Sequence, residues 1–183
     1  MLTITIPKQE IYNPATREFI ETKKDYVLKL EHSLISISKW ETIYKKPYLS
    51  DKEKTPTEFI DYIKCMTMNN DVPDEVYELI SDSDARKIME YINDPATATV
   101  IRDFRKSKRQ AVYEEPTSEL IYYWMLANNI PFEVCEKWRL NRLLTLIKIC
   151  NVKGNPTPMS KADIYAMNTK LNAERRKKYG TTG

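Results

Sequence analysis

Glycine is nearly absent from this sequence: the chain has 183 residues and three glycines, the first of which is Gly154. Phosphate-binding loops need glycine where the backbone closes on the ligand or adopts a positive φ, because a Cβ would clash there. Residues 1–153 therefore cannot form a P-loop or a dinucleotide-binding turn. The commonest nucleotide chemistry is excluded from most of the chain.

Histidine and cysteine are also scarce. His32 is the only histidine, which excludes a catalytic triad, a His-Cys dyad, or a zinc site with several imidazoles. We expect it to be a polar surface residue on a sheet face. The cysteines, Cys65, Cys135 and Cys150, are odd in number and far apart, as is typical of reduced core residues in an intracellular protein. No metal and no cofactor are expected.

The carboxylates of the chain show no pattern that requires catalysis. Paired acids can serve a glycosidase or a two-metal nuclease. The pairs in this chain have local explanations, because acids at helix starts complement the helix dipole and acids in exposed loops are solvated. These pairs are Asp71 with Asp74, Asp82 with Asp84, and Glu114 with Glu115. The sequence therefore predicts that the protein is not an enzyme.

Long apolar runs are missing as well. No segment approaches the roughly 20 apolar residues that a membrane span needs, and the first residues, MLTITIPKQE, do not resemble a signal peptide. The composition is 42% hydrophobic and 30% charged, with a formal net charge of +3. These values predict a folded cytoplasmic protein without a membrane partner, and the charge alone does not indicate nucleic acid.

What is present indicates an α+β protein that is mainly α-helical. Apolar residues alternate over residues 2–6 and 26–30, and residues 17–22 suggest a third strand, so we expect a small N-terminal antiparallel sheet. Helical spacing follows almost throughout. The expected helices begin around residues 33–38, at Thr55, at Pro73, at Ser83 or Asp84, and at Thr117, and two more cover residues 132–151 and the segment after Ser160.

The sequence suggests three regions. Residues 1–48 form a β-rich region with a short helix, residues 49–153 form the helical body, and residues 154–183 form a connector with a basic terminal helix. That last helix should place Ile164, Met167 and Leu171 inward. Residues 95–116 are interpreted as a long loop.

Two groups of side chains are candidates for binding. Aromatic side chains with a neighbouring arginine are typical of protein interfaces, and this candidate group comprises Tyr122, Tyr123, Trp124, Trp138 and Arg139. Basic clusters can contact phosphates, and these residues are Arg102, Arg105, Lys106, Lys108, Arg109, Arg175, Arg176, Lys177 and Lys178. Core packing of the aromatics and solvation of the basic residues are the alternatives.

Long segments resemble a known group of proteins. They read LEHSLISISKWETIYKKPYLSDKEKTPTEFIDYIKCM, TSELIYYWMLANNIPFEVCEKWRLNRLLTLIKICNVKG and, after a proline-containing connector, MSKADIYAMNTKLNAERRKKYG. Together they cover most of residues 30–180 and are similar to tail assembly chaperones of tailed bacteriophages. The likeness lies in tryptophan-bearing apolar helices rather than in a catalytic motif.

The resemblance implies a nonenzymatic morphogenesis protein in the host cell cytoplasm. Such a protein binds the tape measure protein, tail tube subunits or both, and it can be a homo-oligomer. A groove for a long amphipathic helix needs adaptable walls, for which Met66, Met68, Met89 and Met125 are candidates. The alternatives are a small basic nucleic-acid-binding phage protein and a structural component of the tail or connector.

Overall fold

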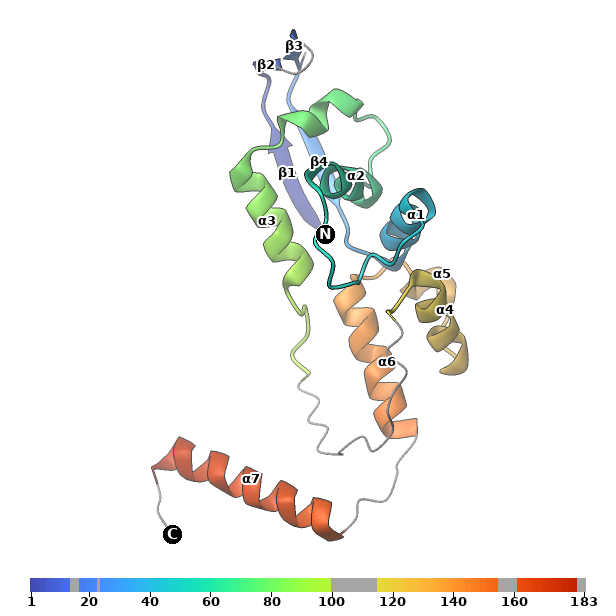
Figure 1. Ribbon diagram of the computed structural model, residues 1–183, viewed down its shortest axis with the longest axis vertical. Coiled ribbons are helices and arrows are strands. Elements are labelled where there is room, and N and C mark those ends of the chain that lie inside the picture. The colour runs from blue at the N-terminus through green and yellow to red at the C-terminus, as the bar shows by residue number, and fades with distance from the viewer. Residues whose placement is uncertain (14–16, 23, 100–114, 155–160, 181–183) are drawn as a thin grey trace. The chain divides into compact units, whose positions relative to one another are not determined.

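The computed structural model describes residues 1–13, 17–22, 24–99, 115–154 and 161–180 (Figure 1). The chain forms two compact units. The first contains Met1–Thr97 and Glu115–Ile147, and the second contains Ala98–Glu114 and Lys148–Gly183. The predicted regions 1–48 and 49–153 thus both contribute to the first unit. The fold class is as predicted, with N-terminal antiparallel strands followed by a mainly helical body.

The N-terminal strands form two short antiparallel pairs. Strand β1 (Leu2–Ile6) pairs with β4 (Tyr26–Leu30), and β2 (Glu10–Asn13) pairs with β3 (Glu18–Glu21). Three residues separate β1 from β2, whereas four separate β3 from β4, so the register changes by one residue between the pairs. The strands expected at residues 2–6, 17–22 and 26–30 correspond to β1, β3 and β4. Strand β2 was not predicted, and the strands form two sheets instead of the one expected.

Alternate residues of β1 and β4 are buried, as their period of two requires. Helix α3 (Asp82–Asn93) packs against β1 (Figure 1). Helices α1 (Leu34–Tyr44) and α2 (Pro56–Met66) pack on each other, and α2 also contacts β4. Trp40 is fully buried there and its indole N–H donates to the Glu58 carbonyl at 2.9 Å.

The remaining helices are η1, a 3-10 helix (Asp74–Leu79), α4 (Ser118–Ala127), α5 (Phe132–Cys135), α6 (Leu140–Gly154) and α7 (Lys161–Tyr179). Hydroxyl caps start several helices where the sequence predicts them. Thr55 and Glu58 form a reciprocal capping box at α2, and Thr117 caps α4. The predicted cap of α3 was wrong: Ser81, not Ser83 or Asp84, accepts the Asp84 N–H at 3.1 Å.

The single helix predicted over residues 132–151 is also wrong. The structure divides it into the one-turn α5 and the longer α6, which ends at Gly154. A tertiary contact explains the break. Ser33 and Arg139 form an isolated antiparallel bridge, and the Leu140 N–H donates to the His32 carbonyl at 2.7 Å. Residues 136–139 therefore leave the helix to pair with a segment that lies far away in the sequence.

Residues other than glycine occupy left-handed positions in this glycine-poor chain. Arg17, Lys45, Ala96 and Asn129 have φ values of 59°, 53°, 50° and 53°. Lys45 ends α1, and its N–H donates to the Glu41 carbonyl at 2.8 Å. A Cβ disfavours this conformation, so each such residue other than Asn carries a backbone cost of about 1 kcal/mol.

Replacing Lys45 with glycine should therefore stabilise the protein. We expect Lys45→Gly to raise the free energy of unfolding by about 0.5–1 kcal/mol, since glycine adopts the left-handed cap without a Cβ clash. Lys39→Gly, at an exposed position inside α1, should lower it by about 1 kcal/mol. Urea unfolding measures both. If both variants lost the same free energy of unfolding, the left-handed conformation of Lys45 would carry no backbone cost.

Candidate partner-binding groove

The first turn of α6 is bonded to two other segments of the chain. Besides the bond from Leu140 to His32, the Asn141 side-chain amide donates to the carbonyls of Ile92 and Asp94 at 2.8 Å and 2.7 Å. Both carbonyls lie at the end of α3, which spans Asp82–Asn93. These bonds fix α6 beside the end of α3 and the start of α1.

Arg139, which directly precedes α6, makes further contacts with the end of α3. We call the contacts of residues 139–141 with His32 and with the end of α3 the junction. The Arg139 guanidinium lies 4.0 Å from the centroid of the Tyr91 ring, and Nη1 is 3.0 Å from Asp94 Oδ2. Nη2 donates to the Tyr91 carbonyl, while Nε is buried without a hydrogen-bond partner among the described residues. The Tyr91 hydroxyl in turn donates to Glu31 at 2.6 Å. With its side chain 18% exposed, Arg139 holds elements together rather than presenting a free surface charge.

His32 is buried, which corrects the prediction of a surface position. It is 2% exposed, its Nδ1 is hydrogen-bonded to the Tyr62 hydroxyl, and the Tyr62 ring stacks on Tyr48 with centroids 3.8 Å apart. Burial, assisted by the positive charge of Arg139, lowers the pKa of His32 to about 4. The imidazole is therefore neutral at physiological pH. The sequence did not predict this burial because the rings around His32 come from other segments, Tyr48 from the segment after α1 and Tyr62 from α2.

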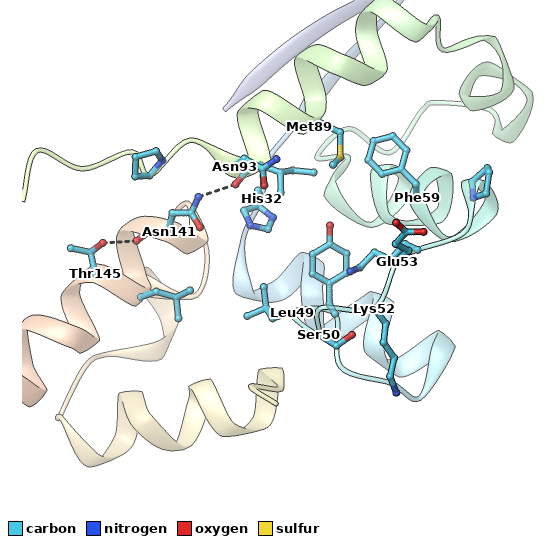
Figure 2. A pocket seen from close by; sticks show the side chains of 16 residues that line it. His32, Leu49, Ser50, Lys52, Glu53, Phe59, Met89, Asn93, Asn141 and Thr145 are labelled. Atoms are coloured by element: carbon cyan, nitrogen blue, oxygen red, sulfur yellow. Dashed lines mark hydrogen bonds between the residues drawn. The ribbon is translucent and has the colours of Figure 1, made fainter. Parts of the chain in front are cut away.

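A groove of about 1010 Å³ opens between α2, α3, α6 and the segment that joins α1 to α2 (Figure 2). Figure 2 shows Met89 and Phe59 on one side and Asn141 and Thr145 on the other. All of its lining residues belong to the first unit. They are His32, Tyr48, Leu49, Ser50, Lys52, Glu53, Lys54, Pro56, Phe59, Met89, Ile92, Asn93, Pro95, Asn141, Leu144 and Thr145.

Several polar groups of the groove are already bonded within the protein. Asn141 donates to the end of α3, and the Thr145 hydroxyl donates to the Asn141 carbonyl at 2.8 Å. His32 is bonded to Tyr62. The Lys54 ammonium lies 4.6 Å from the Tyr48 ring centroid, and burial lowers the pKa of Lys54. The groove consequently offers mainly apolar wall, with exposed charges of both signs along the segment between α1 and α2.

The four candidate methionines have different positions. Met89 is 45% exposed and lines the groove. Met68 is 57% exposed and does not line it, while Met66 and Met125 are fully buried. Only Met89 fits the predicted role as an adaptable wall of this groove. Met66 and Met125 are core residues.

The aromatic candidates lie outside the groove. Tyr123 is exposed on α4, whereas Tyr122, Trp124 and Trp138 are half-buried. The Tyr122 hydroxyl donates to Glu136 at 3.0 Å. Trp138 lies under the Arg142 guanidinium, 4.7 Å from its centre to the ring centroid. Sequence reasoning missed the groove because segments from four parts of the chain form it, and no local motif marks them.

The basic candidates divide into two groups. Arg102, Arg105, Lys106, Lys108 and Arg109 lie outside the described residues. Residues 175–178 are exposed at the end of α7. Within the described ranges, no three His, Cys, Asp or Glu side chains are grouped to hold a metal ion, and no helix is long and apolar enough to cross a membrane.

Comparison of the chain with known protein families, curated proteins and solved structures finds no match. Function is therefore inferred from the groove and from the exposed side chains. The groove's volume of about 1010 Å³ exceeds those of two other pockets of the first unit, about 570 Å³ and 310 Å³, and a large concave pocket is a usual place for a binding site.

The buried imidazole predicts a pH dependence of stability. Between pH 6.5, the ordinary pKa, and about 4, the pKa of folded His32, the unfolded chain binds a proton that the folded chain does not. The free energy of unfolding should fall as the pH drops through this interval, by about 3 kcal/mol at most from this residue. His32→Asn should show a shallower fall in urea unfolding. The same slope in both proteins would contradict the buried neutral imidazole.

Removing the Arg139 guanidinium should destabilise the first unit. We expect Arg139→Met to lower the free energy of unfolding by about 2–3 kcal/mol, mainly because the Tyr91 carbonyl loses a charged donor and the Tyr91 ring loses its cation. The ion pair with the half-exposed Asp94 adds little, because water solvates that carboxylate. Arg142→Met removes a more exposed guanidinium from the first turn of α6 and should cost about 0.5–1 kcal/mol. Chemical denaturation measures both. A loss at Arg139 no larger than at Arg142 would argue against the junction.

Proposed function

We propose that this chain is a nonenzymatic bacteriophage morphogenesis protein that acts as a tail assembly chaperone in the host cytoplasm. It binds the tape measure protein, with tail tube subunits as further partners. The observation that best supports this proposal is the open, mainly apolar groove between α2, α3 and α6. The sequence resemblance suggests the partner.

An amphipathic helix suits this groove better than a small polar ligand. Such a helix presents apolar residues at spacings of three and four, and it needs a wall of apolar side chains rather than a few orienting polar groups. Phe59 and Leu144 supply rigid wall, and Met89 adapts to different side chains. A small-molecule site would need convergent polar groups, whereas Asn141 and His32 are engaged within the protein.

Binding also fits the groove better than catalysis. His32 is the one histidine of the chain, and its Nδ1 is hydrogen-bonded to Tyr62 while burial lowers its pKa. A general base must reach the proton that it removes and must have a pKa near the working pH. His32 meets neither condition well.

One observation favours nucleic acid as a second candidate. Residues 175–178 place four cations in succession at the exposed end of α7, and Tyr179 beside them is exposed as well. Such a cluster can contact phosphates while the ring stacks on a base. Steeply salt-dependent retention on DNA, lost when residues 175–178 are replaced by glutamine, would favour this alternative.

Coexpression with the candidate partner tests the main proposal. The probe is the product of the very long reading frame expected immediately downstream of this gene. The unmodified chain should copurify with it, and Met89→Asp should weaken binding about tenfold or more, because a carboxylate cannot be buried against an apolar helix face.

Met68→Asp is the matched control. It places the same charge on another exposed methionine, outside the groove, so the complex should persist. Circular dichroism should show equal folding of both variants. Failure of the unmodified chain to copurify, or equal loss in both variants, would overturn the proposed role of the groove.

A further inference from the structure

The charges of the groove wall are unequally solvated. Among the described residues that line the groove, three side chains carry a charge at physiological pH: Lys52, Glu53 and Lys54. Lys52 and Glu53 are exposed and opposite in sign, and Figure 2 shows Lys52 pointing away from the other labelled side chains. Lys54 is half-buried, and burial lowers its pKa because it penalises the charged form. The groove wall therefore holds a positive charge that water solvates only in part.

Lys54 has no carboxylate of its own within the described ranges. No acid there lies within 4.0 Å of its ammonium. Glu58 attracts Lys54 from farther away, and Lys46 repels it. Both oxygens of Glu58 are already engaged, because Oε1 accepts from the Lys46 ammonium and Oε2 accepts the Thr55 N–H at 3.0 Å. The charge of Lys54 is thus left without a direct partner.

An aromatic platform holds the Lys54 ammonium at the groove wall. The ammonium lies over the Tyr48 ring, 4.6 Å from its centroid. Tyr48 is fixed in turn, because its ring stacks on Tyr62 and its N–H donates to the Glu41 carboxylate at 2.8 Å. A cation over an aromatic ring is held less strongly than one hydrogen-bonded to a carboxylate. The ammonium is therefore positioned in the free chain but not neutralised.

We propose that the helix bound in the groove carries an aspartate or glutamate beside its apolar stripe, and that this carboxylate pairs with Lys54. This inference rests on the proposed function and specifies the chemistry of the partner. A helix that covers the groove removes further water from Lys54, which is unfavourable for a cation without a partner. A carboxylate at this point replaces that cost with an attractive contact. It thereby selects which helices bind and in which register.

A single carboxylate on a helix fits the groove better than a polyanion does. Nucleic acid presents a row of phosphates and needs several cations side by side. The groove wall has Lys54 half-buried next to the exposed Glu53, which would repel a second negative charge. The apolar part of the wall, which includes Phe59, Met89 and Leu144, needs apolar side chains opposite it. The partner is accordingly apolar along its face and acidic at its edge.

Two synthetic amphipathic peptides of identical composition test the inference. Both carry leucine at helical spacings of three and four. One has glutamate on both sides of the leucine stripe and glutamine on the opposite face, and the other has these positions exchanged. In fluorescence anisotropy, the first peptide should bind the full-length chain about fivefold or more tightly than the second, since only its carboxylates reach Lys54. Equal binding of the two peptides would overturn the pairing.

Two lysine variants show whether Lys54 causes the preference. Lys54→Met should abolish it, because the variant keeps an unbranched apolar side chain and removes only the ammonium. Lys52→Met is the matched control, since it removes an exposed lysine from the same segment, and the preference should persist. A preference that survives in Lys54→Met, or that both variants lose equally, would come from general charge attraction and would overturn the pairing.

Met89→Asn separates this inference from the proposed function. If the groove binds helices, this uncharged polar substitution should weaken both peptides by about the same factor, whether or not Lys54 selects between them. Peptides that bind equally well and are both weakened by Met89→Asn would support the groove and overturn only the pairing with Lys54. If neither peptide binds, the role of the groove and the inference both fail.

Discussion

The junction at the start of α6 is the contact on which the first unit depends. There the Leu140 N–H reaches the His32 carbonyl, and Arg139 bonds to the end of α3 through Tyr91 and Asp94. Three segments distant in sequence are thereby joined at one point. A buried guanidinium without these partners would be strongly unfavourable, so its contacts specify one arrangement.

The groove follows from that junction. Its walls are the flanks of α3 and α6, which Asn141 holds together, and the segment after α1, which Glu41 fixes through the Tyr48 N–H. The same carboxylate accepts the Ser118 N–H and so holds the start of α4. Buried polar contacts therefore position the groove, while its wall is mainly apolar.

Local sequence signals predicted local structure. The Thr55 and Glu58 capping box and the Thr117 cap were readable because all of their partners lie within three residues. Contacts between distant segments could not be predicted in this way: Arg139 and Tyr91 are 48 residues apart, and Glu41 and Ser118 are 77 apart. The bridge between Ser33 and Arg139 interrupts the helix predicted over residues 132–151, and the rings of Tyr48 and Tyr62 pack against His32. The sequence did not predict the groove, because segments that are far apart in the chain form its walls.

Native-state hydrogen exchange at the Leu140 amide tests the account most directly. This amide donates to His32 across the junction, at the first turn of α6 where no bond within the helix could protect it. If the junction holds the first unit together, Leu140 should exchange only on global unfolding, among the slowest amides of the chain. Exchange as fast as that of the amides in exposed α7 would contradict the account.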